Sequence, residues 1–381
     1  MKIKLNLCHA AFILLTASLL IGSGCSKKES SSSATSTADN STSPFTVSEI
    51  TQTNSGDGYF TGSFVVPSDG ISFLLSTHKD NNASVAFYSL SDPDGTDILS
   101  SSSTPNLNGV ASGSLGGSGY ANVLVPQSPS FSAKAGTWTF KAYNNDRVKL
   151  ALRSRSTPTS TTIVVQPYIT GTTWAAGDLT ATLSVMSGIY STNGITLTIN
   201  STITISDSQY AAISGTFTDS TTSALVSQGV TEGVNLFFIE DYSDSEHLGK
   251  AAGIPGSMGI ANSWNGVLIS LTAHASGTTL ASQLLGETAA HEMGHQLGLF
   301  HTTESGGTVF DIISDTAECP KSLDKNSNSQ IQMSAEECEG YGAENVMFWT
   351  AWSSSSRSAG KKQETLSSYQ QQVLKYSPIA K

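Results

Sequence analysis

One short stretch, HEMGHQLGLFH at positions 291–301, constrains this chain more than any other part of it. His291 and His295 lie four residues apart, so on an α-helix their side chains stack on one face and can hold one metal ion between them. Gly298 can adopt the left-handed conformation that ends a helix and turns the chain. His301 then returns toward the first two histidines. The stretch therefore predicts a helix over about 279–298 that ends in a sharp turn.

The residue types in this stretch favour a catalytic zinc site. Three neutral imidazoles leave the fourth position of a tetrahedral ion open to water or substrate, whereas a structural zinc site is closed by four protein ligands. Glu292 lies beside the ligands, where its carboxylate can act as a general base on a zinc-bound water. An ordinary amphipathic helix with surface histidines would explain neither His301 nor Gly298.

The full pattern resembles that of the metzincin zinc endopeptidases, which carry a methionine in a tight turn below the metal. Residues 345–347, Asn-Val-Met, match that turn. The resemblance implies that Met347 is an apolar floor of the site and not a ligand. It also implies an α+β catalytic domain, in which a mixed, twisted sheet carries an active-site helix, and a protein or peptide as the substrate.

The segment after the third histidine narrows the resemblance. Asp311, Asp315 and Thr316 are spaced as in the pappalysin-type branch of the metzincins, and the Asn-Val-Met turn is similar to the turn of that branch. The similarity extends roughly over residues 160–381 and is dense only over 285–350. Calcium ligands at Asp311 and Asp315 are implied by the resemblance alone.

Two positions depart from the branch. Trp349 stands where the family usually has a tyrosine that swings toward the metal. An indole can only donate from its ring nitrogen, so the resemblance does not extend to a tyrosine switch. Ala317 replaces the proline that usually follows Asp-Thr. By analogy with the family, Phe348, Trp349 and Trp352 are expected to shape an apolar substrate pocket beside the metal.

A polar loop offers a second set of calcium ligands. Asp324, Asn326 and Asn328 place oxygen atoms at alternate positions, as calcium loops do. The glycine typical of position six is Ser329 here, so a solvated polar loop stays an open alternative.

The first 24 residues predict a secretory signal. Lys2 and Lys4 precede an apolar run over 10–21, which at about 12 residues is too short to cross a membrane. The small residues before Cys25 resemble a bacterial lipobox, in which this cysteine is lipidated and becomes the mature N-terminus. Gly22 stands where an aliphatic residue is usual in that motif. We expect an exported lipoprotein of the bacterial outer membrane or cell surface, and a freely secreted protein is the alternative.

The chain beyond the signal is acidic and holds one cysteine pair. Residues 25–43 are rich in Ser and Thr and predict a flexible tether. Once Cys8 is removed with the signal and Cys25 is acylated, Cys319 and Cys338 remain, and an oxidising setting favours a disulfide between them. Without the two signal lysines the 19 basic residues fall to 17 against 30 acidic ones, a formal balance of −13. This balance disfavours nucleic-acid binding.

Residues 44–154 are expected to form an all-β sandwich or jelly roll. Apolar side chains alternate with small or polar ones, and turn sequences rich in Asp, Asn, Pro and Gly separate the runs. The alternating apolar positions are Ile71, Phe73, Leu75, Trp138, Phe140, Ala142, Val148, Leu150 and Leu152. A polar stretch that contains Pro158 marks the end of this domain.

Residues 160–381 alternate between strand and helix patterns. The expected elements are a strand over 162–167, a helix with Leu179, Leu183, Met186 and Tyr190 on its apolar face, a strand or hairpin over 195–205, a central strand over 233–239, an edge strand over 262–271 and a last helix over 365–375. An edge strand in a metzincin pairs with extended substrate backbone, so the segment 262–271 is expected to bind the substrate.

These features predict a monomeric, zinc-dependent endopeptidase that meets the membrane only through its N-terminal lipid. His291, His295 and His301 would hold one Zn²⁺, and Glu292 would take the proton from the attacking water. The rival hypothesis is an adhesin or binding lipoprotein that keeps the protease fold as a scaffold without catalysis. Zinc content and peptide turnover would separate the two.

Overall fold

The structure is a computed structural model, and it describes residues 45–100, 116–154, 160–244, 247–325 and 332–381. These residues belong to one compact unit, Ser43–Lys381. The predicted signal, Cys25 and the tether lie outside the described residues, as do Asn326 and Asn328 of the predicted calcium loop. No helix in the described ranges has the length and apolar character needed to span a membrane.

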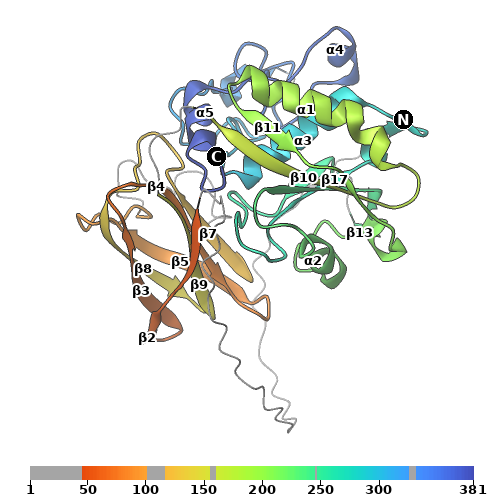
Figure 1. The fold of residues 1–381 in the computed structure, drawn as a ribbon. Coiled ribbons are helices and arrows are strands. Elements are labelled where there is room, and N and C mark those ends of the chain that lie inside the picture. Colours follow the sequence, from red (N-terminus) through yellow and green to blue (C-terminus); the bar gives the residue numbers. More distant parts are fainter. Residues whose placement is uncertain (1–44, 101–115, 155–159, 245–246, 326–331) are drawn as a thin grey trace. The chain divides into compact units, whose positions relative to one another are not determined.

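The strands before residue 155 form two antiparallel sheets (Figure 1). Their bounds are β1 (Thr46–Ile50), β2 (Gln52–Gly56), β3 (Tyr59–Val66), β4 (Gly70–His78), β5 (Ser84–Ser91), β6 (Gly116–Ser118), β7 (Tyr120–Val125), β8 (Gly136–Tyr143) and β9 (Arg147–Ser154). One sheet has the order β1-β9-β4-β7 and the other the order β2-β3-β8-β5-β6.

The two sheets enclose an apolar core, as the alternating pattern predicts. Phe73 and Leu75 from β4 and Trp138 from β8 are buried in this core. Ile71 is only half-buried, because it lies near the start of β4. The intervening Leu74 is fully buried too, but on the opposite face of the sheet and in a different core cluster. The sheet that contains β4 is therefore covered on both faces.

The rest of the chain folds around a six-stranded mixed sheet with the order β11-β10-β14-β17-β16, in which β12 also pairs with β10. The strands are β10 (Thr162–Thr170), β11 (Thr196–Ile199), β12 (Ile203–Ile205), β14 (Val234–Ile239), β16 (Gly249–Ala251) and β17 (Val267–Ser270). Two small pairs stand apart, β13 (Ala212–Ile213) with β15 (Asp241–Tyr242) and β18 (Ala275–Ser276) with β19 (Thr279–Leu280). Only β16 runs antiparallel to its neighbour in the main sheet.

Helices cover both faces of this sheet (Figure 1). They are α1 (Thr180–Thr192), α2 (Ser220–Val226), α3 (Ser282–Gln296), α4 (Ser354–Ser358) and α5 (Ser368–Lys375), with single 3-10 turns η1 (Ala176–Leu179), η2 (Ser208–Tyr210), η3 (Thr272–His274) and η4 (Lys321–Leu323). The central strand β14 shows how the layers are built. Leu236 and Phe238 join the core under α1 and α3, whereas Phe237 and Ile239 join the core on the α2 side. The apolar run over 233–239 is thus a central strand buried on both faces, as predicted.

Three predicted elements need correction. The segment 262–271 is not an edge strand, because its only strand, β17, lies between β14 and β16. The edge on that side is β16, which was missed because three residues are too few to show a period of two. The segment 195–205 is not a hairpin, since β11 and β12 both run parallel to β10. The last helix, predicted over 365–375, begins only at Ser368, because Ser367 is its N-cap. Helical spacing would place Leu366, Tyr369 and Val373 on one apolar face of it, but Tyr369 is 40% exposed.

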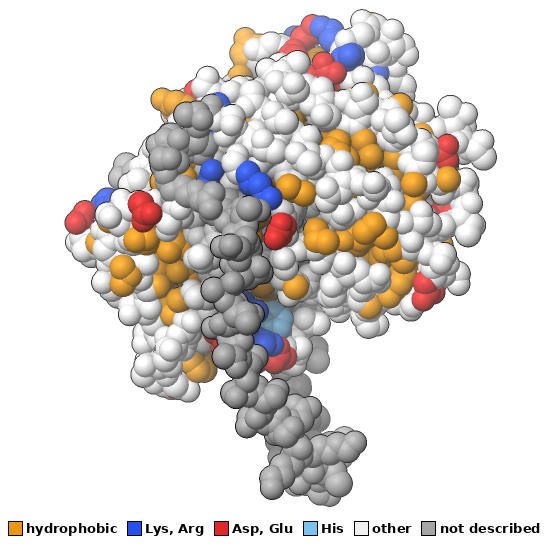
Figure 2. All heavy atoms as spheres, viewed as in Figure 1, with side chains coloured by type: hydrophobic (Ala, Val, Ile, Leu, Met, Phe, Trp, Pro, Cys, Tyr) orange, Lys and Arg blue, Asp and Glu red, His pale blue; other side chains and the backbone are white. Residues whose placement is uncertain are grey.

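The surface is sparsely charged. On the face shown in Figure 2, acidic and basic side chains stand singly or in small groups among uncharged ones. This matches a composition in which only 13% of residues are charged.

Cys319 and Cys338 form a disulfide, as the cysteine arithmetic predicts. Both residues are fully buried, in a cluster with Met333, Phe348 and Trp352. The described residues between the two cysteines include no strand or α-helix, and the disulfide joins the two ends of this segment.

Loss of the disulfide should lower stability without changing the fold. For a bridge between residues 19 apart in sequence, the chain-entropy model gives a stabilisation of about 3 kcal/mol. The double variant Cys319→Ala/Cys338→Ala should lose about that much in urea unfolding. Reductant should shift the wild-type curve toward that of the variant and leave the variant unmoved. Coincident curves for the oxidised wild type and the variant would contradict the prediction.

His274 ties η3 to α3 inside the core. Its Nδ1 atom lies 2.7 Å from the carbonyl oxygen of Ser270, and its Nε2 atom lies 2.9 Å from the Thr288 hydroxyl. Because a carbonyl can only accept, Nδ1 carries the proton and Nε2 accepts from Thr288. Burial, together with the charge of Arg357, lowers the pKa of His274 to about 4. The sequence indicated no role for this residue.

Neutral His274 should make stability depend on pH. Because the folded pKa of about 4 lies below the ordinary histidine pKa of 6.5, the contribution of neutral His274 to stability is fully present above pH 6.5 and is lost as pH falls toward 4. The stability advantage of the wild type over His274→Gln should shrink by about 2 kcal/mol between pH 7 and pH 4.5. Urea unfolding of both metal-free proteins at the two pH values measures this. An advantage that stays constant would show that His274 does not titrate in this range.

Candidate metal centre

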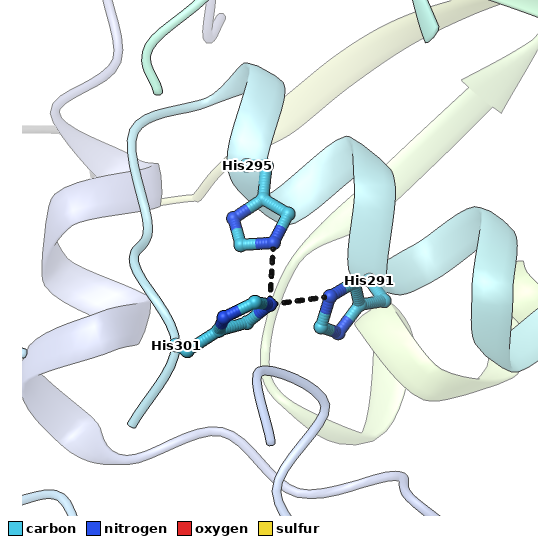
Figure 3. A group of neighbouring side chains, drawn as sticks. All are labelled: His291, His295 and His301. Atoms are coloured by element: carbon cyan, nitrogen blue, oxygen red, sulfur yellow. Dashed lines mark hydrogen bonds between the residues drawn. The ribbon is translucent and has the colours of Figure 1, made fainter. Parts of the chain in front are cut away.

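Three histidine side chains converge at the end of α3 (Figure 3). His291 and His295 come from consecutive turns of the helix, and His301 comes from the segment that follows it. The Nε2 atom of His301 lies 3.1 Å from that of His295 and 3.2 Å from that of His291. These three residues are the one group in the described ranges whose ligand atoms lie close enough to share a metal ion.

Gly298 allows the third histidine to return. The helix ends at Gln296 with Leu297 as its C-cap, and Gly298 has φ +104°, a conformation that side chains rarely adopt. The amide of Leu299 then donates to the carbonyl of Gly294. The predicted helix end and turn are both confirmed.

The Nδ1 atoms fix the direction of all three rings. That of His291 lies 2.6 Å from the Val346 carbonyl oxygen, and that of His295 lies 2.7 Å from the Leu299 carbonyl oxygen. Each must carry the proton, because a carbonyl oxygen only accepts. The Nδ1 atom of His301 lies 3.1 Å from a carboxylate oxygen of Glu304, which likewise only accepts when ionised.

It follows that the three Nε2 atoms present lone pairs to one another. A neutral imidazole carries one proton, and with that proton on Nδ1 no Nε2 atom can donate a hydrogen bond. Lone pairs only 3.1–3.2 Å apart repel unless a cation lies among them. Zinc–nitrogen bonds of about 2.0–2.1 Å in tetrahedral geometry separate the nitrogen atoms by about 3.3 Å. The residues therefore fit a zinc ion.

Burial keeps the imidazoles in the neutral form that binds metals. Desolvation, with a smaller contribution from His301, lowers the pKa of His291 to about 3. Desolvation and the neighbouring histidines hold the pKa of His295 well below its usual value. Both rings are ready to coordinate without first losing a proton.

The Asn-Val-Met turn, residues 345–347, packs against α3 at the metal centre. Met347 is fully buried, and a Cβ atom placed on Gly294 would lie 2.4 Å from its sulfur, so the methionine lies directly against α3. Asn345 holds the turn, because its Oδ1 accepts from the Met347 amide at 2.8 Å and its Nδ2 donates to Gln370 of α5 at 2.8 Å. The floor role that the family resemblance implies for Met347 stays a prediction.

Glu292 lies on α3 beside the histidines and under the edge strand β16. Burial raises the pKa of its carboxyl group to about 8, although a hydrogen bond from the Ala251 backbone and the charge of Lys250 act in the opposite direction. A Cβ atom on Gly249 would lie 2.6 Å from Glu292 Cγ. The absence of a side chain at Gly249 thus lets β16 pass directly over Glu292.

The predicted apolar pocket is wrong for two of its three residues. Phe348 and Trp352 are 1% and 3% exposed and pack around the disulfide, so they cannot line an open pocket. Trp349 is half-buried, and its ring nitrogen donates to the Met333 carbonyl at 2.8 Å. The prediction failed because the sequence after Met347 does not show which of its aromatic side chains pack against the disulfide between Cys319 and Cys338.

The predicted calcium residues receive no support from the described contacts. Asp311 accepts from Thr316 and from the Ile313 amide, while Asp315 accepts from Ser367 and the Tyr369 amide at the start of α5. Burial raises the pKa of Asp311 to about 7. Asp324 is the C-cap of η4, and its predicted co-ligands lie outside the described residues. Calcium binding stays a prediction.

Three supporting residues escaped the sequence analysis. Val346 contributes only its backbone carbonyl, so no sequence pattern could have revealed it. Gln370 reaches Asn345 from 25 residues away. Glu304 follows the third histidine by three residues and contacts its Nδ1 atom. An acidic residue so close to a metal ligand was the one sequence feature that could have indicated a supporting role.

The comparison with known families agrees with this geometry. Residues 177–302 match the model of Reprolysin_3, described as Metallo-peptidase family M12B Reprolysin-like. The match runs from η1 to one residue beyond the third histidine. No curated protein matches the chain. The family match and the histidine cluster together support a metzincin-like metallopeptidase with a zinc site.

Proposed function

We propose that the protein is a zinc-dependent endopeptidase of the pappalysin-like branch, exported as a lipoprotein. The observation that carries the zinc chemistry is the convergence of three Nε2 atoms at distances that suit one metal ion. When bound, zinc polarises the scissile carbonyl and lowers the pKa of the attacking water. His291, His295 and His301 would hold it.

Glu292 is the proposed general base. Its carboxylate lies on the same helix as two of the ligands and is buried, so it can take a proton from water and return it to the leaving amine. A divalent cation between the histidines would favour its ionised form, which offsets the effect of burial on its pKa.

Strand β16 supports an extended peptide as the substrate. It ends the main sheet on the side of Glu292, and no other described strand pairs with its outer edge. A substrate added to this edge would pass over the general base, because Gly249 brings the strand against Glu292. We propose that this edge takes the role that the sequence analysis gave to 262–271.

The variant Glu292→Gln should bind zinc but hydrolyse peptides about 10²–10⁴ times more slowly, because it removes only the proton acceptor. A mixed peptide library read by mass spectrometry measures turnover and cleavage preference, and metal analysis measures zinc. His301→Ala is the matched control, expected to lose zinc and turnover together.

Three outcomes would be informative. Normal turnover by Glu292→Gln would refute its role as the base. Undiminished zinc in His301→Ala would refute the ligand set. A wild-type protein that binds zinc but cleaves nothing would favour the non-catalytic adhesin.

The proposed anchor rests on the sequence alone. If Cys25 is acylated, the protein should partition into detergent with the membrane fraction, since two or three acyl chains at about 0.8 kcal/mol per buried methylene suffice for retention. Cys25→Ser should be unprocessed or released. Mass spectrometry of the mature N-terminus decides between the two: an unmodified end at another residue would establish free secretion and leave the zinc chemistry untouched.

A further inference from the structure

The strand β7 of the sandwich is shared between two cores. Val123 and Val125 point into the sandwich. Leu124 points the other way and belongs to the same buried cluster as Met293, Leu299 and Met347 of the metal centre. The sandwich is therefore packed against the elements that hold the histidines.

The contact falls on the turn between the second and third histidines. A Cβ atom on Gly298 would lie 2.7 Å from Leu124 Cδ2, so this leucine covers the Gly298 Cα directly. Gln127, two residues beyond β7 and 3% exposed, donates from Nε2 to the Gly298 carbonyl oxygen at 2.9 Å. Close by, Asn122 of β7 donates to the Pro255 carbonyl at 3.0 Å. The next residue, Gly256, donates to the carbonyl of Gln296 at the end of α3.

The Gly298 carbonyl needs this donor from outside the helix. The residue is buried and lies beyond the last helical hydrogen bonds, where carbonyl groups commonly lack partners. Among the described residues, the side chain of Gln127 is the donor that this carbonyl has. A buried carbonyl without a donor would favour a different turn.

His301 depends on that turn. It follows Gly298 by three residues, whereas His291 and His295 are held by the helix itself. A shift of the Gly298 peptide would displace the segment that follows it. That segment contains His301 and also Leu299, whose carbonyl orients the His295 ring. Zinc binding tolerates only small errors in ligand position.

We infer that the β-sandwich is a structural part of the zinc centre, in which Gln127 and Leu124 are positioning residues that hold the turn presenting His301. This rests on the proposed zinc site. The sandwich is thus not a detachable accessory domain, because the turn that presents His301 receives a hydrogen bond and an apolar contact from it.

The test is the zinc affinity of Gln127→Met, measured in the purified full chain by competition with a chromophoric chelator. Methionine keeps the length of glutamine but cannot donate. The zinc dissociation constant should rise about 10-fold, as for other residues that orient a ligand indirectly. The Co²⁺-substituted variant should also show altered visible absorption, which reports the coordination geometry and not global stability.

Tyr120→Phe is the matched control. Tyr120 lies on the same strand and the same interface, where its hydroxyl accepts from Asn262 of the α+β part at 3.3 Å, but it does not touch Gly298. The zinc affinity and the Co²⁺ spectrum of the Tyr120→Phe protein should equal those of the wild type. If Gln127→Met does not fold, Gln127→Asn keeps a buried amide but withdraws the donor by one methylene, and should act in the same direction.

Two results would overturn the inference. One is a zinc dissociation constant of the Gln127 variant within twofold of the wild type. The other is an equal loss in Tyr120→Phe, which would indicate general loosening of the interface. A wild-type protein that binds no zinc at all would instead overturn the proposed function and this inference with it.

Discussion

The organisation of the metal centre depends on one constraint, the fixed direction of three imidazole rings. Two backbone carbonyls and one carboxylate occupy the Nδ1 atoms, so the Nε2 lone pairs of His291, His295 and His301 are forced toward one another. A metal ion bound by all three Nε2 atoms would satisfy that arrangement. The Asn-Val-Met turn, the Gly298 turn and the end of α3 can each be understood as supports for these rings. A change in any of them would alter how the lone pairs meet.

Those supports come from distant parts of the chain. The backbone carbonyl of Val346 accepts a hydrogen bond from His291. The turn that contains Val346 is linked to α5 by the hydrogen bond from Asn345 to Gln370. Gln127 reaches Gly298 across 171 residues of sequence. The site is therefore assembled by the folding of the whole compact unit, Ser43–Lys381, and not by the local motif. Such long-range supports are the usual way in which metal ligands are held rigidly.

The proposed general base is buried between α3 and the edge strand β16. Glu292 lies in a helix that is covered by other elements on most sides, and burial raises its pKa. The edge strand β16 crosses it at Gly249, where no side chain intervenes. Phe348 and Trp352 pack in the buried cluster that contains the disulfide.

The sequence alone determined the local chemistry. Helical spacing places His291 and His295 on one face, and Gly298 permits the turn, because both features depend on residues close together in the sequence. The disulfide could be predicted from the number of cysteines that remain after the signal. Only the tertiary structure decided which strand forms the sheet edge, where the aromatic residues after Met347 point, and that Val346, Gln370 and Gln127 support the site. These depend on contacts between residues far apart in the chain or on a backbone carbonyl, which no period or motif records. The sandwich shows the difference most clearly: alternation predicted its strands, but not that the outer face of β7 would complete a second core.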